Sequence, residues 1–409
     1  MLKRITQITL PVCLLLMATA AAIPSPQESQ EKKGPQVKDR QEYDLIQKAI
    51  GETDPAAKIQ VLDQWKEKYL ETDYEVERLR MYMASYQQTQ QPAKAIETAK
   101  ELLEKVPGDF SASYTITLLT PFLGDTSPAV LGDGETAAKG LLAGAIEKQF
   151  ASKPENISQA DWDSAKKGAT VSAYQTLGWI AMQRKENVAA EEQFKQVLQL
   201  NPNAGQVSYW LGNVVLAQGD PTKNETALFS FARASVYEGE GALPPESRQQ
   251  VDAYLTKVYT KYAGTEEGLD ELKAMARNQA LPPADLKIES AEVRSFNAEQ
   301  AARKANPQLY MFIDLKNKLT GTAGEQTWSE LRGKLTPEFR LYVVSANPPE
   351  RPQTINLSSR QGGPVEVVLN LEVRRRTGLG SGQLVRFEGV ASDLTRQPFR
   401  LTLVDGQLL

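Results

Sequence analysis

Carboxylates are the side chains of this chain that could carry acid–base chemistry, because the sequence has no histidine and its single cysteine, Cys13, lies in the N-terminal apolar run. These absences exclude the commonest general base, a cysteine nucleophile beyond that run, and the usual zinc ligands. Paired carboxylates can still act as acid and base. The nearest groups are Asp161 with Asp163, and Glu191 with Glu192. On helices such residues are usually caps or lie on solvated faces, so we expect no enzyme activity and no cofactor.

Metal and phosphate sites are not indicated by the acidic and glycine-containing loops. The segments 133–135 (Asp-Gly-Glu) and 219–220 (Gly-Asp) are too sparse for a calcium loop, which needs oxygen ligands at alternating positions and a closing Glu. No glycine-rich phosphate loop follows a predicted strand. We therefore expect no bound metal.

Arginines form the one concentration of charge, in the C-terminal part. From residue 330 onward there are eleven Lys and Arg against eight Asp and Glu, although the whole chain has a net charge of −4. Guanidinium groups match phosphates and stack on aromatic rings, so an anion-binding face is one hypothesis. Its candidate residues are Arg374, Arg375, Arg376, Arg386 and Arg400. A solvated strand end and turn is the alternative that we favour.

The N-terminal residues 1–22 are typical of a secretory signal peptide. Lys3 and Arg4 precede an apolar run, and alanines around position 20 offer small-residue cleavage sites. We expect a periplasmic or secreted protein with no membrane span after cleavage, and therefore no nucleic-acid partner. An uncleaved N-terminal anchor is the alternative. Residues 23–41 are polar and rich in Pro, and are expected to form a disordered leader.

A 34-residue repeat then organises residues 42–283. Leu177-Gly178 recurs as Leu211-Gly212. A small residue with an aromatic residue four positions later follows each of them, as Ala190 and Phe194 and then as Ala227 and Phe231. Gly178 and Ala190 let two helices approach closely, with Phe194 filling the gap, so the pattern predicts stacked helix-turn-helix units. A poorer copy, at 79–107, lacks the aromatic residue.

Further helices are expected at 110–119, 135–150, 246–262 and 266–279, with a long loop at 121–134. Residues 284–335 should form a helical connector, with helices at 306–319 and near Trp328. The last part, 336–409, alternates apolar and polar residues, as in Val365, Val367 and Leu369. It predicts strands at 339–345, 353–359, 364–374, 383–391 and 398–404, which suit a five-stranded barrel of the oligonucleotide/oligosaccharide-binding type.

Leu177-Gly178, Ala190 with Phe194, and Pro202 together resemble the tetratricopeptide repeat. The segments 382–390 and 398–403 look like the small barrels that follow helical repeats in exported bacterial proteins. The first resemblance implies an α-solenoid whose groove holds peptides or helices of partner proteins and has no chemistry of its own.

Helical spacing from the Leu-Gly positions predicts which residues face that groove. The candidates are Arg80, Gln87, Gln175, Trp179, Gln183, Tyr209 and Asn213, with Leu216 as a further possibility. The alternative is that Trp179 and Tyr209 pack against the neighbouring unit. We expect a non-enzymatic scaffold for protein–protein interaction in the bacterial envelope. Two other classes stay open: a protein whose barrel captures a polyanion or glycan, and a hydrolase based on carboxylates.

Overall fold

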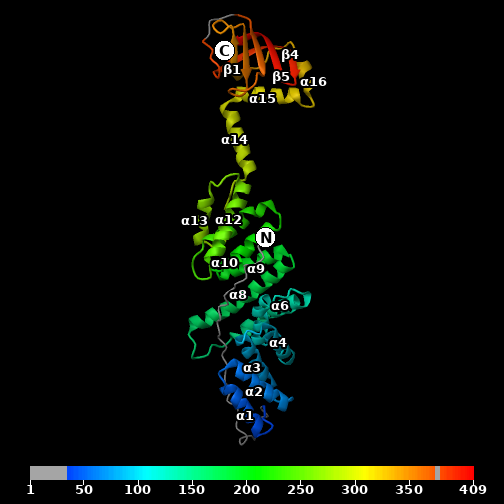
Figure 1. Cartoon of the computed structure of the whole chain (residues 1–409), viewed down its shortest axis with the longest axis vertical. Helices are drawn as coiled ribbons and strands as arrows, with labels where there is room; N and C mark the ends of the chain where they lie inside the picture. The colour runs from blue at the N-terminus through cyan, green and yellow to red at the C-terminus, as the bar shows by residue number, and fades with distance from the viewer. Residues whose placement is uncertain (1–34, 374–377) are drawn as a thin grey trace. The chain divides into compact units, whose positions relative to one another are not determined.

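The computed structural model describes residues 35–373 and 378–409, so the expected signal peptide lies outside the described residues. The chain divides into two compact units, one ending at Ile288 and one beginning at Glu289 (Figure 1). The first unit is helical, and the second combines three helices with a closed barrel of five strands. This architecture confirms the predicted fold class.

The helical unit is a succession of antiparallel helical hairpins. Its elements are α1 (Arg40–Gly51), α2 (Pro55–Lys68), α3 (Glu75–Gln88), α4 (Pro92–Lys105), α5 (Phe110–Leu119), η1 (Thr120–Phe122), α6 (Pro128–Gly140), η2 (Leu141–Ala145), α7 (Ile146–Gln149), α8 (Gln159–Gln183), α9 (Asn187–Leu200), α10 (Gly205–Leu216), η3 (Pro221–Lys223), α11 (Asn224–Val236), α12 (Pro245–Ala263) and α13 (Leu269–Asn278). From α1 to α12 successive helices pack on one another, with α9 joining its own hairpin to α10 of the following one, whereas α13 packs on α11.

Local sequence explains where several of these helices begin. The Asp54 carboxylate accepts the backbone N–H of Ala57 at 2.7 Å, and Pro55 occupies the first turn of α2, where its missing N–H costs no hydrogen bond. Asp109 caps α5 in the same way. Ser158 caps α8. These caps satisfy backbone donors that the helices themselves leave unpaired.

Two sequence expectations in this unit need correction. The helix expected at 135–150 begins earlier, at Pro128, and is interrupted at Gly144, whose φ of +151° is not helical. The loop expected at 121–134 is therefore short. The leader expected to extend to 41 also ends earlier, because α1 begins at Arg40 and the Tyr74 hydroxyl donates to the Pro35 carbonyl.

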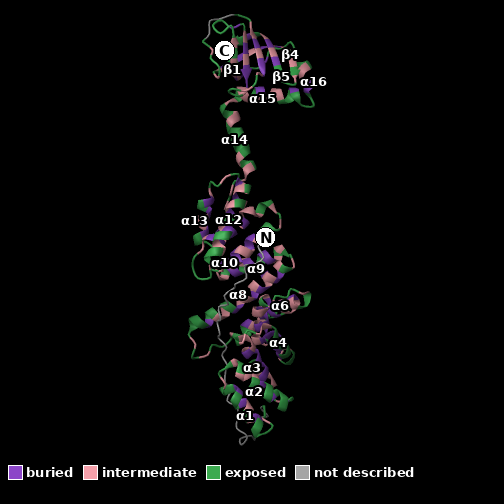
Figure 2. Cartoon of the chain, viewed as in Figure 1, coloured by how far each residue is buried: buried purple, intermediate pink, exposed green. Residues whose placement is uncertain are grey.

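The core of the helical unit lies between its helices, on the sides where the buried residues are found (Figure 2). Phe194, Phe231 and Trp65 are fully buried. Arg233 is also buried, and it donates to the carbonyls of Ala276 and Arg277 at the end of α13 at 3.0 and 2.6 Å. A buried cation is tolerated there because helix C-termini present unpaired carbonyls.

The second unit begins with α14 (Ala291–Ala305), α15 (Pro307–Thr320) and α16 (Gly324–Leu331), followed by β1 (Phe339–Asn347), β2 (Thr354–Ser358), β3 (Val367–Leu371), β4 (Leu384–Arg396) and β5 (Phe399–Leu408). The strands close in the order β1-β2-β3-β5-β4. All pairs are antiparallel except β3 with β5. Five predicted strands are confirmed, although β3 is shorter than the predicted segment 364–374.

Helix α15 contributes to the barrel core. Phe312 is fully buried, and its ring lies 5.6 Å from that of Phe339 and 6.2 Å from that of Phe399. The Lys316 ammonium is 2.5 Å from the buried Glu366 carboxylate, just before β3. A helix that precedes the barrel in the sequence thus completes the core of the barrel.

Candidate partner-binding surface

A close crossing between α8 and α9 fixes how α8 is rotated. A Cβ atom placed on Gly178 would lie 2.5 Å from the Cε1 atom of Phe194, so only glycine fits at this contact. The Thr176 hydroxyl, on another side of α8, donates to the Thr117 carbonyl of α5 at 2.9 Å. With these two sides covered, the remaining side of α8 carries Gln175, Trp179 and Gln183 at steps of four residues.

We call Gln175, Trp179 and Gln183 the α8 stripe. Gln183 is exposed, and the other two are half-buried. Among the described residues, the two side-chain amides make no hydrogen bond, and Trp179 does not belong to any packed apolar cluster. An indole and two amides that the fold does not use are available for a partner, since the ring buries apolar area and amides both donate and accept.

The matching residues of α10 are partly used by the fold. The ring of Tyr209 lies 6.1 Å from that of Phe231, on α11 of the same hairpin, and packs against the core. The Asn213 amide donates to the Tyr209 carbonyl of its own helix at 2.9 Å. The side-chain oxygen of the half-buried Asn213 remains available as a hydrogen-bond acceptor.

Sequence reasoning did not single out Gln206, which is half-buried three residues before Tyr209 on the same face of α10. Its spacing of seven residues from Asn213 was the signal that could have found it. Leu216, the further possibility named from helical spacing, is 39 % exposed.

The two candidates on α3 connect hairpins to each other. Arg80 forms an ion pair of 2.7 Å with Asp109, and the Gln87 amide donates to the Thr115 hydroxyl at 2.6 Å. Hydrogen bonds from Ser111 and Arg80 outweigh the effect of burial and lower the pKa of Asp109. Both contacts reach from α3 to α5. Arg80 and Gln87 therefore position consecutive hairpins and leave less capacity for a partner.

The described part of the structure does not bring together the arginines proposed as an anion-binding face. Arg374, Arg375 and Arg376 lie outside the described residues. Arg386 forms two hydrogen bonds with the Glu338 carboxylate, at 2.5 and 2.8 Å, and these raise the pKa of its guanidinium. Arg400 is exposed on β5. Phe387 is fully buried, so its ring belongs to the barrel core and not to an exposed face.

The carboxylates considered for acid–base chemistry have structural partners. Asp161 accepts the hydroxyl of Ser158 at 2.7 Å, and Asp163 accepts the amide of Gln159 at 2.9 Å. Both therefore belong to the first turns of α8, as the capping alternative predicts.

The buried Glu191 is the hub of a network of partly exposed polar side chains. Its carboxylate accepts from Lys195 at 2.5 Å, and from Lys223 and Gln218 at 2.7 Å each. Burial alone would raise the pKa of Glu191, but these hydrogen bonds outweigh burial and lower it to about 2. A carboxylate held so firmly in its ionised form is a poor proton carrier near neutral pH. No group of three or more Cys, Asp or Glu in the described ranges could hold a metal ion.

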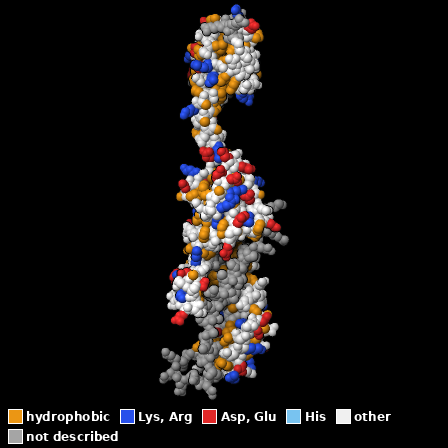
Figure 3. All heavy atoms as spheres, turned by 90° about the vertical axis from the view of Figure 1, so that its left-hand side faces the viewer, with side chains coloured by type: hydrophobic (Ala, Val, Ile, Leu, Met, Phe, Trp, Pro, Cys, Tyr) orange, Lys and Arg blue, Asp and Glu red, His pale blue; other side chains and the backbone are white. Residues whose placement is uncertain are grey.

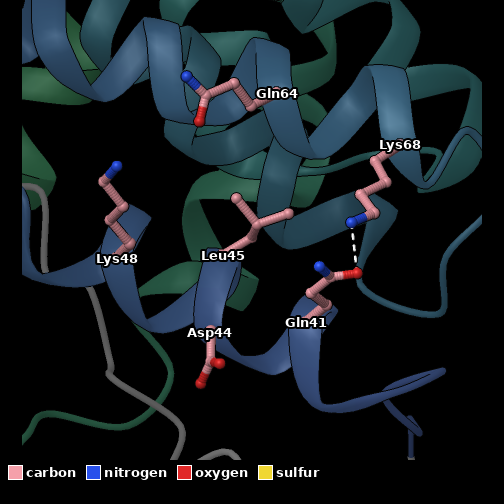
Figure 4. A pocket seen from close by; sticks show the side chains of 6 residues that line it. All are labelled: Gln41, Asp44, Leu45, Lys48, Gln64 and Lys68. Carbon is pink, nitrogen blue, oxygen red and sulfur yellow. Dashed lines mark hydrogen bonds between the residues drawn. The ribbon is translucent and has the colours of Figure 1, made fainter.

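A shallow hollow lies between α1 and α2 (Figure 4). Its lining is Gln41, Asp44, Leu45, Lys48, Gln64 and Lys68. The Lys68 ammonium donates to the Gln41 side chain across it. On the face seen in Figure 3, acidic and basic side chains are interspersed without a large patch of one sign.

A scan against protein-family models finds no match, and a search of curated proteins finds no significantly similar sequence. Within the described residues, no helix has both the length and the apolar character needed to cross a bilayer.

Proposed function

We propose that this chain is an exported, non-enzymatic binding protein whose helical hairpins hold a segment of a partner protein. The observation that carries the proposal is the α8 stripe, in which the half-buried Trp179 and two amides without a hydrogen bond lie on a helix fixed by close packing. Unpaired amides and an indole on a preorganised helix lower the entropy cost of binding. Export is proposed from the N-terminal sequence alone.

We further propose that the hairpins are tetratricopeptide repeats. Three copies share a residue with positive φ at the end of the first helix: Gln90 at 55°, Lys185 at 62° and Gly219 at 67°. In two copies, the backbone N–H of the following residue donates to the carbonyl of the residue five positions earlier. Gln91 donates to Tyr86, and Glu186 donates to Ala181. Such agreement at matching sequence positions supports one repeated unit.

Affinity capture tests the proposed function. The chain from residue 23 onward, immobilised and exposed to an envelope extract, should retain specific proteins, and Trp179→Ala or Asn213→Ala should reduce that retention while the helical circular dichroism stays unchanged. Phe296→Ala, which removes a 60 % exposed aromatic ring from α14, is the matched control and should bind as the parent does. If both surface variants retain the same proteins as the parent, the proposal is wrong.

A further inference from the structure

The start of the described chain is held against the beginning of α3. The Pro35 carbonyl accepts the Tyr74 hydroxyl at 3.0 Å, and the Gln36 backbone N–H donates to the Asp73 carboxylate at 3.0 Å. We call these two contacts the anchor. Residues 23–34, which follow the expected signal peptide, precede the anchor and lie outside the described residues. The anchor therefore sets which surfaces those residues can reach.

Helix α3, beside the anchor, packs in parallel with α5. Arg80 pairs with Asp109, the cap of α5, at 2.7 Å. Seven residues further along α3, the Gln87 amide donates to the Thr115 hydroxyl at 2.6 Å. Because both contacts advance together along the two helices, α3 and α5 run in the same direction.

Helix α8 lies on the other side of α5 and continues this row. The Thr176 hydroxyl donates to the Thr117 carbonyl at 2.9 Å. The rings of Phe110 and Trp162, near the starts of α5 and α8, lie 5.8 and 4.7 Å from the ring of Phe150. The starts of α5 and α8 are thus on the same side, and the row α3, α5, α8 leads from the anchor to the α8 stripe.

The separation between the anchor and the stripe follows from these contacts. Taken level by level, Trp179 is about sixteen helical residues, or roughly 24 Å, further along the row's direction than the start of α3. Two steps between neighbouring helices of about 8–10 Å each add roughly 18 Å sideways. Trp179 therefore lies about 30 Å from the anchor.

The stripe has the length of a short polyproline II segment. Gln175 and Gln183 are separated by about 12 Å along α8, with Trp179 midway. Four residues of polyproline II also span about 12 Å, and their carbonyls make no internal hydrogen bonds. Side-chain amides can donate to such carbonyls, while proline rings pack on an indole.

Residues 23–27, with the sequence Ile-Pro-Ser-Pro-Gln, have the matching chemistry. Their two prolines favour polyproline II and have no N–H that needs a partner. Residues 28–34 contain four charged side chains and no apolar one. At about 3.1 Å per residue, residues 25–34 span roughly 31 Å, which equals the separation between the anchor and Trp179.

We propose that residues 23–27 bind the α8 stripe of their own molecule as a polyproline II segment, with the proline rings against Trp179. This inference rests on the proposed function and adds a regulation to it, because a partner must displace the segment. A short connection gives the segment an effective concentration of about 1 mM. If its intrinsic Kd is about 0.1 mM, the partner's apparent Kd rises roughly tenfold.

A fluorescent label tests where the segment lies. The chain from residue 23 onward has no cysteine, so Ser25→Cys can be labelled alone. The label is bimane, whose fluorescence is quenched by contact with tryptophan. We expect a loss of fluorescence that does not depend on protein concentration and that Trp179→Phe relieves. Ser29→Cys with the same label, four residues closer to the anchor, is the matched control and should be quenched less.

A truncated chain tests the regulation. The chain from residue 35 onward keeps every described residue and should retain more of the envelope proteins than the chain from residue 23 onward. A synthetic peptide of residues 23–34 should bind the truncated chain and reduce that retention. The same peptide with Pro24→Ser and Pro26→Ser should bind more weakly.

The outcomes separate this inference from the proposed function. If Trp179→Phe leaves the fluorescence unchanged while Trp179→Ala still lowers partner retention, the inference is wrong and the proposed function stands. Quenching that disappears on dilution would show that a second copy supplies the segment, which also overturns the inference. If quenching depends on Trp179 but the truncated chain retains no envelope protein, the inference stands and the proposed function is wrong.

Discussion

Gly178 lies directly against the ring of Phe194, so close that a Cβ atom on the glycine would be 2.5 Å from Cε1. The next hairpin repeats this contact, with the Cβ position of Gly212 at 2.8 Å from the same atom of Phe231. Carbon atoms in ordinary contact are about 3.5–4.0 Å apart. The two helices of each hairpin can therefore reach their observed separation only with glycine at this position.

Gly178→Ala should destabilise the helical unit by about 1–3 kcal/mol, because the extra methyl group forces the ring or the helix to move. Urea unfolding followed by circular dichroism would measure it. The control is Gly168→Ala in the same helix, where a Cβ atom meets nothing within 4 Å. That change should stabilise by about 0.5–1 kcal/mol, through helix propensity. Equal midpoints for the two variants would refute the close crossing.

Much of the fold could be predicted because local pattern and tertiary contact coincide. The spacing of Gly178 and Phe194 predicts the helix crossing, and the alternation of Val367 and Leu369 predicts a half-buried strand. The barrel followed from such alternation together with turn residues. In each case the residue type needed by the contact also carries the local signal.

The features that could not be predicted depend on contacts between residues that lie far apart in the sequence. Gly132 and Gly134 suggested a loop, but they lie within α6, where a Cβ atom on Gly134 would be 2.7 Å from the Thr120 side chain. A glycine needed for a close helix contact has the same sequence appearance as one needed for a turn. The pairing of Arg80 with Asp109, which reduces its value for a partner, was hidden for the same reason.

The residue with positive φ after each first helix should respond to substitution in opposite ways. Lys185 has φ of 62°, a conformation that costs a side-chain residue about 1 kcal/mol relative to glycine. Lys185→Gly should therefore raise stability by up to about 1 kcal/mol, and Gly219→Ala should lower it by a similar amount. Thermal midpoints of the two variants and the parent would check this. If both substitutions shifted the thermal midpoint in the same direction, positions 185 and 219 would not be equivalent.

Glu191 should make part of the stability depend on pH. Its pKa is lowered to about 2 in the folded chain, so its contribution is complete above the unfolded pKa, about 4.3, and is lost as pH falls toward 2. Glu191→Gln should lower stability by about 1–3 kcal/mol at pH 7, since it removes the negative charge and one of the two acceptor oxygens that the Lys195 and Lys223 ammonium groups contact. The difference from the parent should shrink as pH falls through this window.

Glu192→Gln is the control for that measurement, because Glu192 is the exposed neighbour on α9. It should leave the thermal midpoint nearly unchanged at every pH. A loss at pH 7 that is equally large for both variants would contradict the assigned role of Glu191 as the hub that holds Lys223 and the η3 turn.

Phe312 of α15 should be essential for folding of the barrel, although the first strand begins only at Phe339. Its ring is fully buried among the rings of Phe339 and Phe399, so Phe312→Ala should cost about 3–5 kcal/mol. A fragment of residues 336–409 lacks α15 altogether and should not fold, whereas a fragment of residues 289–409 should show dispersed amide resonances by NMR. Met311→Ala, on the same helix but 45 % exposed, is the control and should change stability little. A folded 336–409 fragment would show that the five strands form a complete core alone, and that α15 is only attached to it.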